Sequence, residues 1–211
     1  MSAIAGESTR EVYIALFRGQ KIPLNSPEGI PVLANKIKLL KLSASRIVKE
    51  YESNEATELA ADIQKRWASS QRGRLILIGH SAGADSVLEF VYRYGKQIHV
   101  DYAITLDPVG NWKVLSNNVP GRNYYTTLGL LHGHPVTGAE NVDLTRRQDT
   151  CVMGEQHAFT HTIIDDCELI QSEVAALVRQ TVDDASAPTT AELATPPPTP
   201  TGLHRTDVHA P

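Results

Sequence analysis

Short apolar runs alternate along the chain with stretches whose apolar residues recur at helical spacing. The apolar runs predict five strands, at Val12–Phe17, Ser45–Tyr51, Arg74–Ile78, Tyr102–Leu106 and Arg122–Thr127. The helical spacing predicts four helices, which begin near Ser26, Ala56, Ala82 and Cys167. Strands that alternate with helices in this way are typical of βα units around a mostly parallel sheet, so the predicted fold class is α/β.

The chain divides into one folded unit and two flanking segments. Residues 11–182 carry all of the predicted strands and helices, and residues 1–10 are a short N-terminal extension. Residues 183–211 contain six of the twelve prolines and almost no bulky apolar side chain. Such a segment buries too little apolar surface to offset the entropy of ordering it. We therefore predict a disordered tail at 183–211 and place no catalytic residue there.

Composition excludes several classes of function. The 211 residues are 41% hydrophobic and 21% charged, with a formal net charge of −4, which is typical of a globular domain and lacks the basic surface that nucleic acids require. No apolar run reaches the length of a membrane span, and no secretion signal is visible at the N-terminus. Cys151 and Cys167 do not indicate a disulfide framework, so we expect a reducing, cytoplasmic setting.

Candidate chemistry begins directly after the strongest predicted strand. The pentapeptide G-H-S-A-G over residues 79–83 matches the G-x-S-x-G nucleophile elbow, and a helical pattern follows it at once. Glycines flank the serine in this motif because the sharp strand-to-helix turn leaves little room for side chains. The strand, motif and helix together predict that Ser81 is a nucleophile.

A serine nucleophile needs a base and an acid that orients the base. Asp107 ends a predicted strand, at the edge where parallel sheets place their functional side chains, and is the preferred acid. In hydrolases of the α/β type the acid follows the serine and the histidine follows the acid. Asp143 and Asp149 remain alternatives that satisfy the same order.

The base must come from the eight histidines of the chain. His80 lies within the elbow, where its side chain is expected to point away from the nucleophile. His161 lies just before the last predicted helix, where the base of this architecture belongs, and is the preferred base. His157, four residues earlier, is the alternative.

An oxyanion hole needs backbone N–H groups that face the developing negative charge. Ala82, the residue after the nucleophile, is expected to supply one N–H. The second is expected from the loop after the first strand, at Arg18, Gly19 or Gln20. Arg18 could also meet an anionic group of the substrate.

Competing chemistry finds weaker support. His132 and His134, or His157 and His161, have the spacing of metal ligands, but neither pair has a clear third ligand. No phosphate-binding G-x-x-x-x-G-K-[ST] string is present. We therefore expect neither a metal nor another cofactor.

Taken together, these motifs resemble the α/β-hydrolase superfamily, and more narrowly a small, lipase- and esterase-like group of bacterial proteins. The resemblance covers roughly residues 11–180 and rests on six segments: VYIALFRG, SPEGIPVLANKI, LILIGHSAGAD, ITLDPV, NYYTT and HTIIDD. It implies a minimal α/β-hydrolase-like three-layer sandwich, with a mostly parallel sheet of about five strands and no large cap domain. It departs from the larger family in lacking extra N-terminal strands and in placing the acid after the strand that directly follows the nucleophile helix.

The resemblance also implies an activity. Ser81, Asp107 and His161 would form the triad of a serine esterase that cleaves a carboxylic ester or thioester through an acyl-enzyme, with a small-molecule or lipid-like substrate. A non-catalytic binding protein with the same fold, or an acyltransferase on the same triad, are the alternatives. Substrate preference depends on segments such as 114–121 and 128–140, whose conformation the sequence does not give. The sequence does not reveal an oligomeric state.

Overall fold

Six strands and four helices make up the part of the chain that the computed structural model describes, which is residues 11–20, 29–68, 73–145, 147 and 161–184. The strands are β1 (Val12–Phe17), β2 (Arg46–Tyr51), β3 (Arg74–His80), β4 (Tyr102–Leu106), β5 (Gly121–Tyr125) and β6 (Glu140–Asp143). The helices are α1 (Gly29–Leu39), α2 (Ala56–Trp67), α3 (Ala82–Tyr94) and α4 (Glu168–Asp184).

All six strands pair in parallel in one sheet, in the order β2-β1-β3-β4-β5-β6. The chain runs from β1 outward to β2 and then returns past β1 to β3, so the strand order reverses between β1 and β3. In open parallel sheets the loops at such a reversal diverge and leave space for a ligand at the carboxyl ends of the strands. The fold therefore favours a site where β1 and β3 end.

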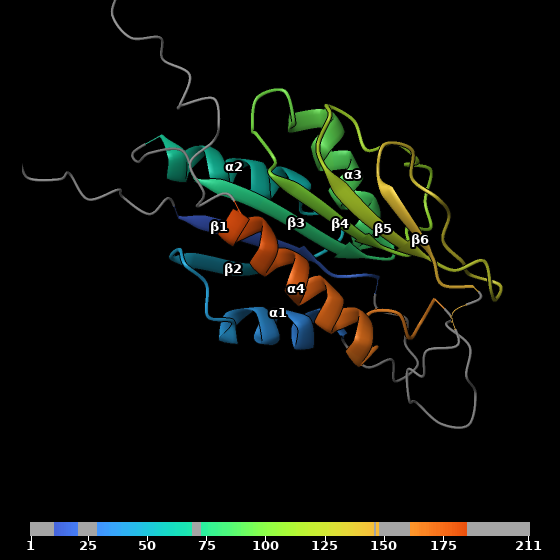
Figure 1. The fold of residues 1–211 in the computed structure, drawn as a ribbon. Coiled ribbons are helices and arrows are strands. Elements are labelled where there is room, and N and C mark those ends of the chain that lie inside the picture. The colour runs from blue at the N-terminus through green and yellow to red at the C-terminus, as the bar shows by residue number, and fades with distance from the viewer. Residues whose placement is uncertain (1–10, 21–28, 69–72, 146, 148–160, 185–211) are drawn as a thin grey trace, which may run out of the picture.

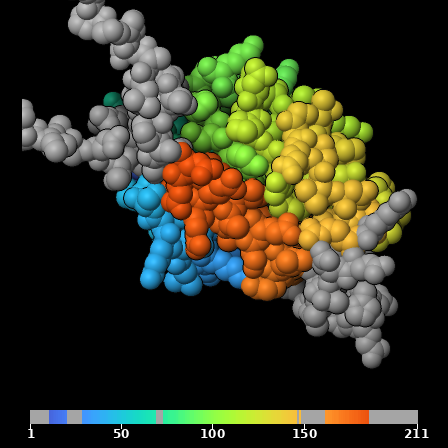
Figure 2. Space-filling view, in the orientation of Figure 1, coloured from blue at the N-terminus to red at the C-terminus, as the bar shows by residue number. Residues whose placement is uncertain are grey.

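Helices cover both faces of the sheet (Figure 1). One face packs against α1 and α4, with Leu33 and Val174 among the buried residues, and the other packs against α2 and α3, with Leu59 and Leu88. In Figure 2 the orange surface of α4 lies between the blue surface around α1 and the yellow surface around β6. The arrangement is a three-layer α/β sandwich, which confirms the predicted fold class.

The sheet differs from the expectation in one strand. β6 was not predicted because Glu140–Asp143 has no buried residue and no apolar run, as an edge strand can have when one side faces water. The helix α4 also continues to Asp184, two residues past the expected domain boundary at residue 182. The five predicted strands agree with β1 to β5 to within a few residues.

Cys167 corrects the expectation that the two cysteines form no disulfide. The structure has Cys167 disulfide-bonded, and the other cysteine of the chain, Cys151, lies outside the described residues. Disulfides persist mainly in oxidising compartments, so the cysteines do not support a reducing, cytoplasmic setting. Across the described residues, no helix combines the length and apolar character needed to cross a bilayer.

Several sequence expectations fall on residues that lie outside the described part of the chain. They concern the N-terminal extension at residues 1–10, the start of the first helix near Ser26, the alternatives Asp149 and His157, and the tail from residue 185 onward. The assignments made for these residues stay predictions.

Candidate active site

Ser81 lies at a sharp turn between β3 and α3. Its backbone has φ 56° and ψ −127°, a conformation that L-residues rarely adopt, and its N–H donates to the carbonyl oxygen of Leu106 at 2.9 Å. The turn brings the two glycines of the motif into close contact: a Cβ at Gly79 would lie 2.2 Å from the carbonyl oxygen of Gly83. The predicted elbow geometry is therefore present at Ser81, with the serine between a buried strand and a helix N-terminus.

Asp107 follows β4 at the same edge of the sheet and is fully buried. Its backbone φ is 54°, and its N–H donates to the carbonyl oxygen of Tyr124 at 2.7 Å. Oδ1 of Asp107 accepts a hydrogen bond from the N–H of Thr126 at 2.8 Å. The end of β5 therefore fixes both the backbone and one carboxylate oxygen of Asp107. The other oxygen, Oδ2, takes no part in these contacts.

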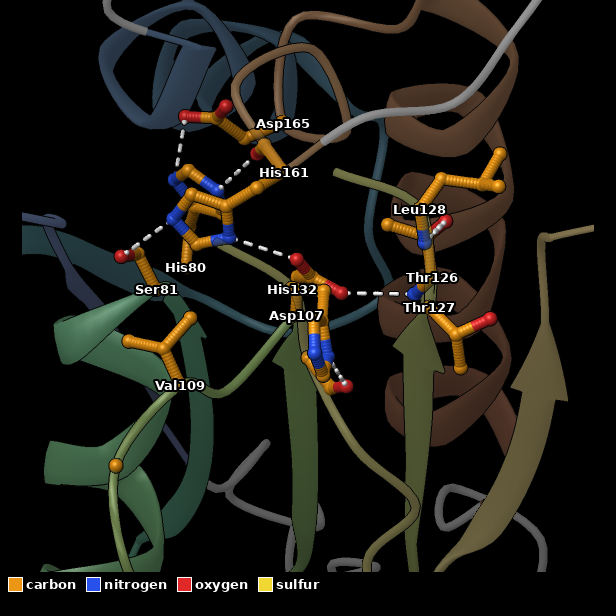
Figure 3. A network of polar contacts seen from close by, with 12 residues as sticks. His80, Ser81, Asp107, Val109, Thr126, Thr127, Leu128, His132, His161 and Asp165 are labelled. Carbon is orange, nitrogen blue, oxygen red and sulfur yellow. Dashed lines mark hydrogen bonds and ion pairs between the residues drawn. The ribbon is translucent and has the colours of Figure 1, made fainter. Parts of the chain in front are cut away.

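His161, in the turn before α4, joins these two residues (Figure 3). Its Nδ1 lies 2.6 Å from Oδ2 of Asp107, and its Nε2 lies 2.8 Å from Oγ of Ser81. An ionised carboxylate only accepts hydrogen bonds, so Nδ1 carries the proton and Nε2 is left to accept the proton of the Ser81 hydroxyl. The structure thus brings together the three side chains that the sequence singled out, in the order Ser81, His161 and Asp107.

The predicted oxyanion donors are only partly supported. The N–H of Arg18 donates to the carbonyl oxygen of Tyr51 at 2.8 Å, and its guanidinium pairs with Glu50 at 2.6 Å. The Arg18 N–H is therefore already engaged by β2, which contradicts its assignment as an oxyanion donor. A contact between its guanidinium and an anionic substrate group stays a prediction. Gly19 lies beside the nucleophile, since a Cβ placed on it would be 3.1 Å from Cβ of Ser81.

Ala82 occupies the first position of α3, directly after Ser81. The first N–H groups of a helix have no partner within the helix. Among the described residues, neither Ala82 nor Gly19 donates a backbone hydrogen bond. These two N–H groups remain candidates for the oxyanion hole. Gln20, the third residue after β1, has an exposed side chain.

The alternative acid Asp143 lies on the edge strand of the sheet. It ends β6, is exposed, and its Oδ1 accepts the N–H of Thr145 at 2.8 Å. His132 and His134 each contact a backbone carbonyl oxygen, and the described part of the chain contains no cluster of three possible metal ligands.

Asp85 holds the segment that follows Asp107. It lies one helical turn after Ser81 on α3, and its Oδ2 accepts hydrogen bonds from the N–H of Gly110 at 2.9 Å and of Val109 at 3.3 Å. Burial raises the pKa of the Asp85 carboxyl group, although these N–H groups oppose the shift. The carboxyl group therefore ties the loop after β4 to the helix that begins at the nucleophile.

The segment after β5, expected to shape substrate preference, runs beside the acid. His132 lies next to Asp107 in Figure 3, and Gly133 packs against the Asp107 carboxyl group. Leu130 and Leu131, just before them, are exposed. The segment that contacts Asp107 through Gly133 thus also carries two exposed apolar side chains.

Sequence reasoning missed a second histidine and its acid. The sequence indicated no role for His80, whose ring lies 5.0 Å from the ring of His161. Nδ1 of His80 lies 3.2 Å from Oδ2 of Asp165. The segment HTIIDD contains Asp165, but no local pattern links that residue to a histidine 85 positions earlier.

No protein-family model matches the chain, and no curated protein does. Solved structures with a related fold include two described as putative hydrolases. One, "of the alpha/beta superfamily", from Xanthomonas campestris pv. campestris, is 12% identical with a TM-score of 0.48, covering 81% of this chain and 99% of its own. The other, YdeN-like, from Pectobacterium atrosepticum, is 15% identical with a TM-score of 0.47, covering 83% and 94%.

An acetyl xylan esterase is 11% identical to this chain, with a TM-score of 0.44 over 82% of this chain and 99% of its own. At these identities and TM-scores the similarity assigns no role to any residue of this chain. The assignment of individual residues in this chain therefore rests on the geometry of its own site.

Proposed function

We propose that the protein is a serine hydrolase that cleaves a carboxylic ester or thioester through an acyl-enzyme on Ser81. One observation carries the proposal: His161 contacts Oγ of Ser81 at 2.8 Å through Nε2 and Oδ2 of Asp107 at 2.6 Å through Nδ1. A base held in this tautomer by a buried carboxylate activates a serine hydroxyl for acyl transfer.

In the first half-reaction Oγ of Ser81 attacks the carbonyl carbon of the substrate while Nε2 of His161 takes the hydroxyl proton. The carbonyl electrons move to oxygen, and in this proposal the N–H groups of Ala82 and Gly19 stabilise that oxyanion. Asp107 stabilises the imidazolium. When the tetrahedral intermediate collapses, the alcohol or thiol leaves with the proton from His161, and the acyl group stays on Ser81.

In the second half-reaction water attacks the acyl-enzyme and gives a proton to Nε2 of His161. Collapse releases the carboxylic acid and returns the proton to Oγ of Ser81. The cycle consumes one ester or thioester and one water, and this chain's own residues carry every proton transfer. Leu130 and Leu131, exposed in the segment that contacts Asp107 through Gly133, favour a substrate with an apolar group, such as a lipid-like ester.

Hydrolysis of short-chain nitrophenyl esters tests the proposal. We expect turnover by the wild type and a loss of about 10⁴-fold or more in kcat for Ser81→Ala and for His161→Ala. Ser172→Ala and His99→Ala, which alter exposed residues away from the site, serve as matched controls and should retain activity.

Two further measurements separate the alternatives. His157→Ala should retain activity if His161 is the base, and a loss there instead would transfer that role. Added alcohols or amines would reveal transfer products if the acyl acceptor is not water. Wild type that is folded but shows neither hydrolysis nor transfer would favour a binding protein of the same fold.

A further inference from the structure

A second histidine–carboxylate pair lies beside the Ser81–His161–Asp107 chain (Figure 3). His80 is the last residue of β3, and Asp165 lies in the turn between His161 and α4. Nδ1 of His80 is 3.2 Å from Oδ2 of Asp165, and Nε2 is 3.0 Å from the backbone carbonyl oxygen of His161. The side chains of His80 and Asp165 are 11% and 8% exposed, so water competes little for these contacts.

The partners of His80 determine its protonation. A backbone carbonyl oxygen only accepts hydrogen bonds, so Nε2 must carry a proton to bond with it. An ionised carboxylate also only accepts, so Nδ1 must carry a proton as well. An imidazole with protons on both nitrogens is a cation, and Asp165 is its counter-ion. The geometry therefore describes a buried ion pair rather than a neutral histidine.

The electrostatic surroundings agree with this protonation. Burial acts to lower the pKa of His80, but the hydrogen bond and charge of Asp165 outweigh it and the pKa is raised. The charged and titratable groups that face His80 are Asp165, Asp166, Asp107 and His161. The carboxylates among them favour the cation, whereas a protonated His161 would oppose it.

The pair is anchored to the helix that follows it. Nε2 of Gln171, a buried residue of α4, donates to the carbonyl oxygen of Asp165 at 2.7 Å. Gly29, the first residue of α1, packs against the backbone and carboxyl group of Asp165. Asp165 is therefore fixed between α1 and α4, and through His80 it connects these helices to the strand that carries the nucleophile.

We propose that His80 and Asp165 form a positioning pair, in which the His80 imidazolium donates to the backbone carbonyl of His161 and holds the base at hydrogen-bonding distance from Ser81. The inference rests on the proposed function, because it assigns the pair its role through His161. Neither residue contacts the reacting atoms. The pair acts on the backbone of the base, while Asp107 acts on its ring.

The protonation of His80 is tested directly by NMR of protein labelled with ¹⁵N-histidine. At pH 7.5, where an ordinary imidazole is mostly neutral, we expect one histidine with protons on both ring nitrogens. Its signals should be absent from His80→Gln and should turn neutral in Asp165→Asn. A neutral His80 at this pH in the wild type would overturn the proposal, whatever the enzymatic activity.

Kinetics test the positioning role. Glutamine can still donate a hydrogen bond but carries no charge, so in His80→Gln we expect kcat to fall about 10–100-fold with little change in KM. The acid limb of the kcat/KM profile should move to higher pH, because Asp165 is left without its cation and favours protonation of His161. His99→Gln, an exposed histidine, is the matched control and should leave kcat and the profile unchanged.

Folded His80→Gln and Asp165→Asn proteins with wild-type kcat and pH profile would overturn the positioning role. Different results would contradict the proposed hydrolase function and the proposed His80–Asp165 pair. Absence of ester turnover in the wild type contradicts the proposed function, whereas the NMR result on His80 does not depend on turnover. If His80→Gln does not fold, Asp165→Asn and the wild-type spectrum still decide the matter.

Discussion

The N–H of Thr126 donates to Oδ1 of Asp107 at 2.8 Å, and this contact turns Oδ2 of the same carboxyl group toward His161. The acid is thus oriented by a strand end, β5, that lies next to its own strand in the sheet. Asp107 directly follows β4, and the contact from Thr126 supplies a physical reason why a carboxylate at this position can serve as the proposed acid.

Asp107→Asn tests the orientation of the base. The amide can donate to Nδ1 of His161, which would leave the proton on Nε2 and remove the acceptor for the Ser81 hydroxyl. We expect kcat/KM to fall by about 10³–10⁴-fold on the best nitrophenyl ester. Asp143→Asn, which alters the exposed alternative acid, should keep kcat/KM within about twofold of wild type in the same assay. A reversed pattern would move the role to Asp143.

Gly83→Ala tests how tightly the elbow packs against β1. A Cβ at Gly83 would lie 2.3 Å from the carbonyl oxygen of Phe17, a backbone atom that cannot move aside as a side chain would. We expect the free energy of unfolding in urea to fall by about 1–3 kcal/mol. Ser172→Ala on the exposed side of α4 provides the reference for a small helical substitution. Unchanged stability would mean that the elbow can shift away from β1.

Asp166→Asn should change stability in a pH-dependent way. Burial, together with the charge of Asp165, raises the pKa of Asp166 to about 6. A carboxyl group with a raised pKa favours the folded state at low pH, and this contribution is lost as pH rises through about 6. The asparagine variant should therefore melt higher than wild type at pH 8, by about 2–4 °C, and at the same temperature at about pH 3, which lies below the ordinary pKa of an aspartate. Equal shifts at both pH values would contradict the raised pKa.

The disulfide at Cys167 leads to a prediction about the reactivity of its thiol before and after reduction. The side chain is disulfide-bonded and 2% exposed, at the start of α4. In denatured protein that has not been reduced, we expect iodoacetamide to leave Cys167 unmodified, and prior reduction to make it fully reactive. Reductant should also lower the stability of the folded protein, by about 2–4 kcal/mol. Full alkylation without reduction would restore the expectation of a reducing setting.

Much of the fold was readable from the sequence because its elements are regular. Strands β1, β3 and β4 are buried apolar runs. The glycines on both sides of Ser81 indicate a sharp turn from a strand into a helix. β6 was not readable, because Glu140–Asp143 pairs through its backbone on one edge and has no buried side chain to leave a pattern. A strand defined by backbone pairing alone gives little signal in the sequence.

The candidate site divides in the same way. Ser81, Asp107 and His161 each follow or precede a recognisable element, so their order along the chain was informative. The engagement of the Arg18 N–H by Tyr51 depends on the pairing of β1 with β2, and the contact of His80 with Asp165 depends on how the last turn folds back over β3. Contacts between segments far apart in the chain leave no local pattern in either segment.

The most direct test of the central claim is labelling with a fluorophosphonate, which reacts with an activated serine and leaves an ordinary alcohol untouched. We predict a covalent adduct on Ser81 of the wild type, located by peptide mass spectrometry, none on Ser81→Ala, and a strongly reduced rate on His161→Ala. No adduct on folded wild-type protein, or a rate that is independent of His161, would contradict the account.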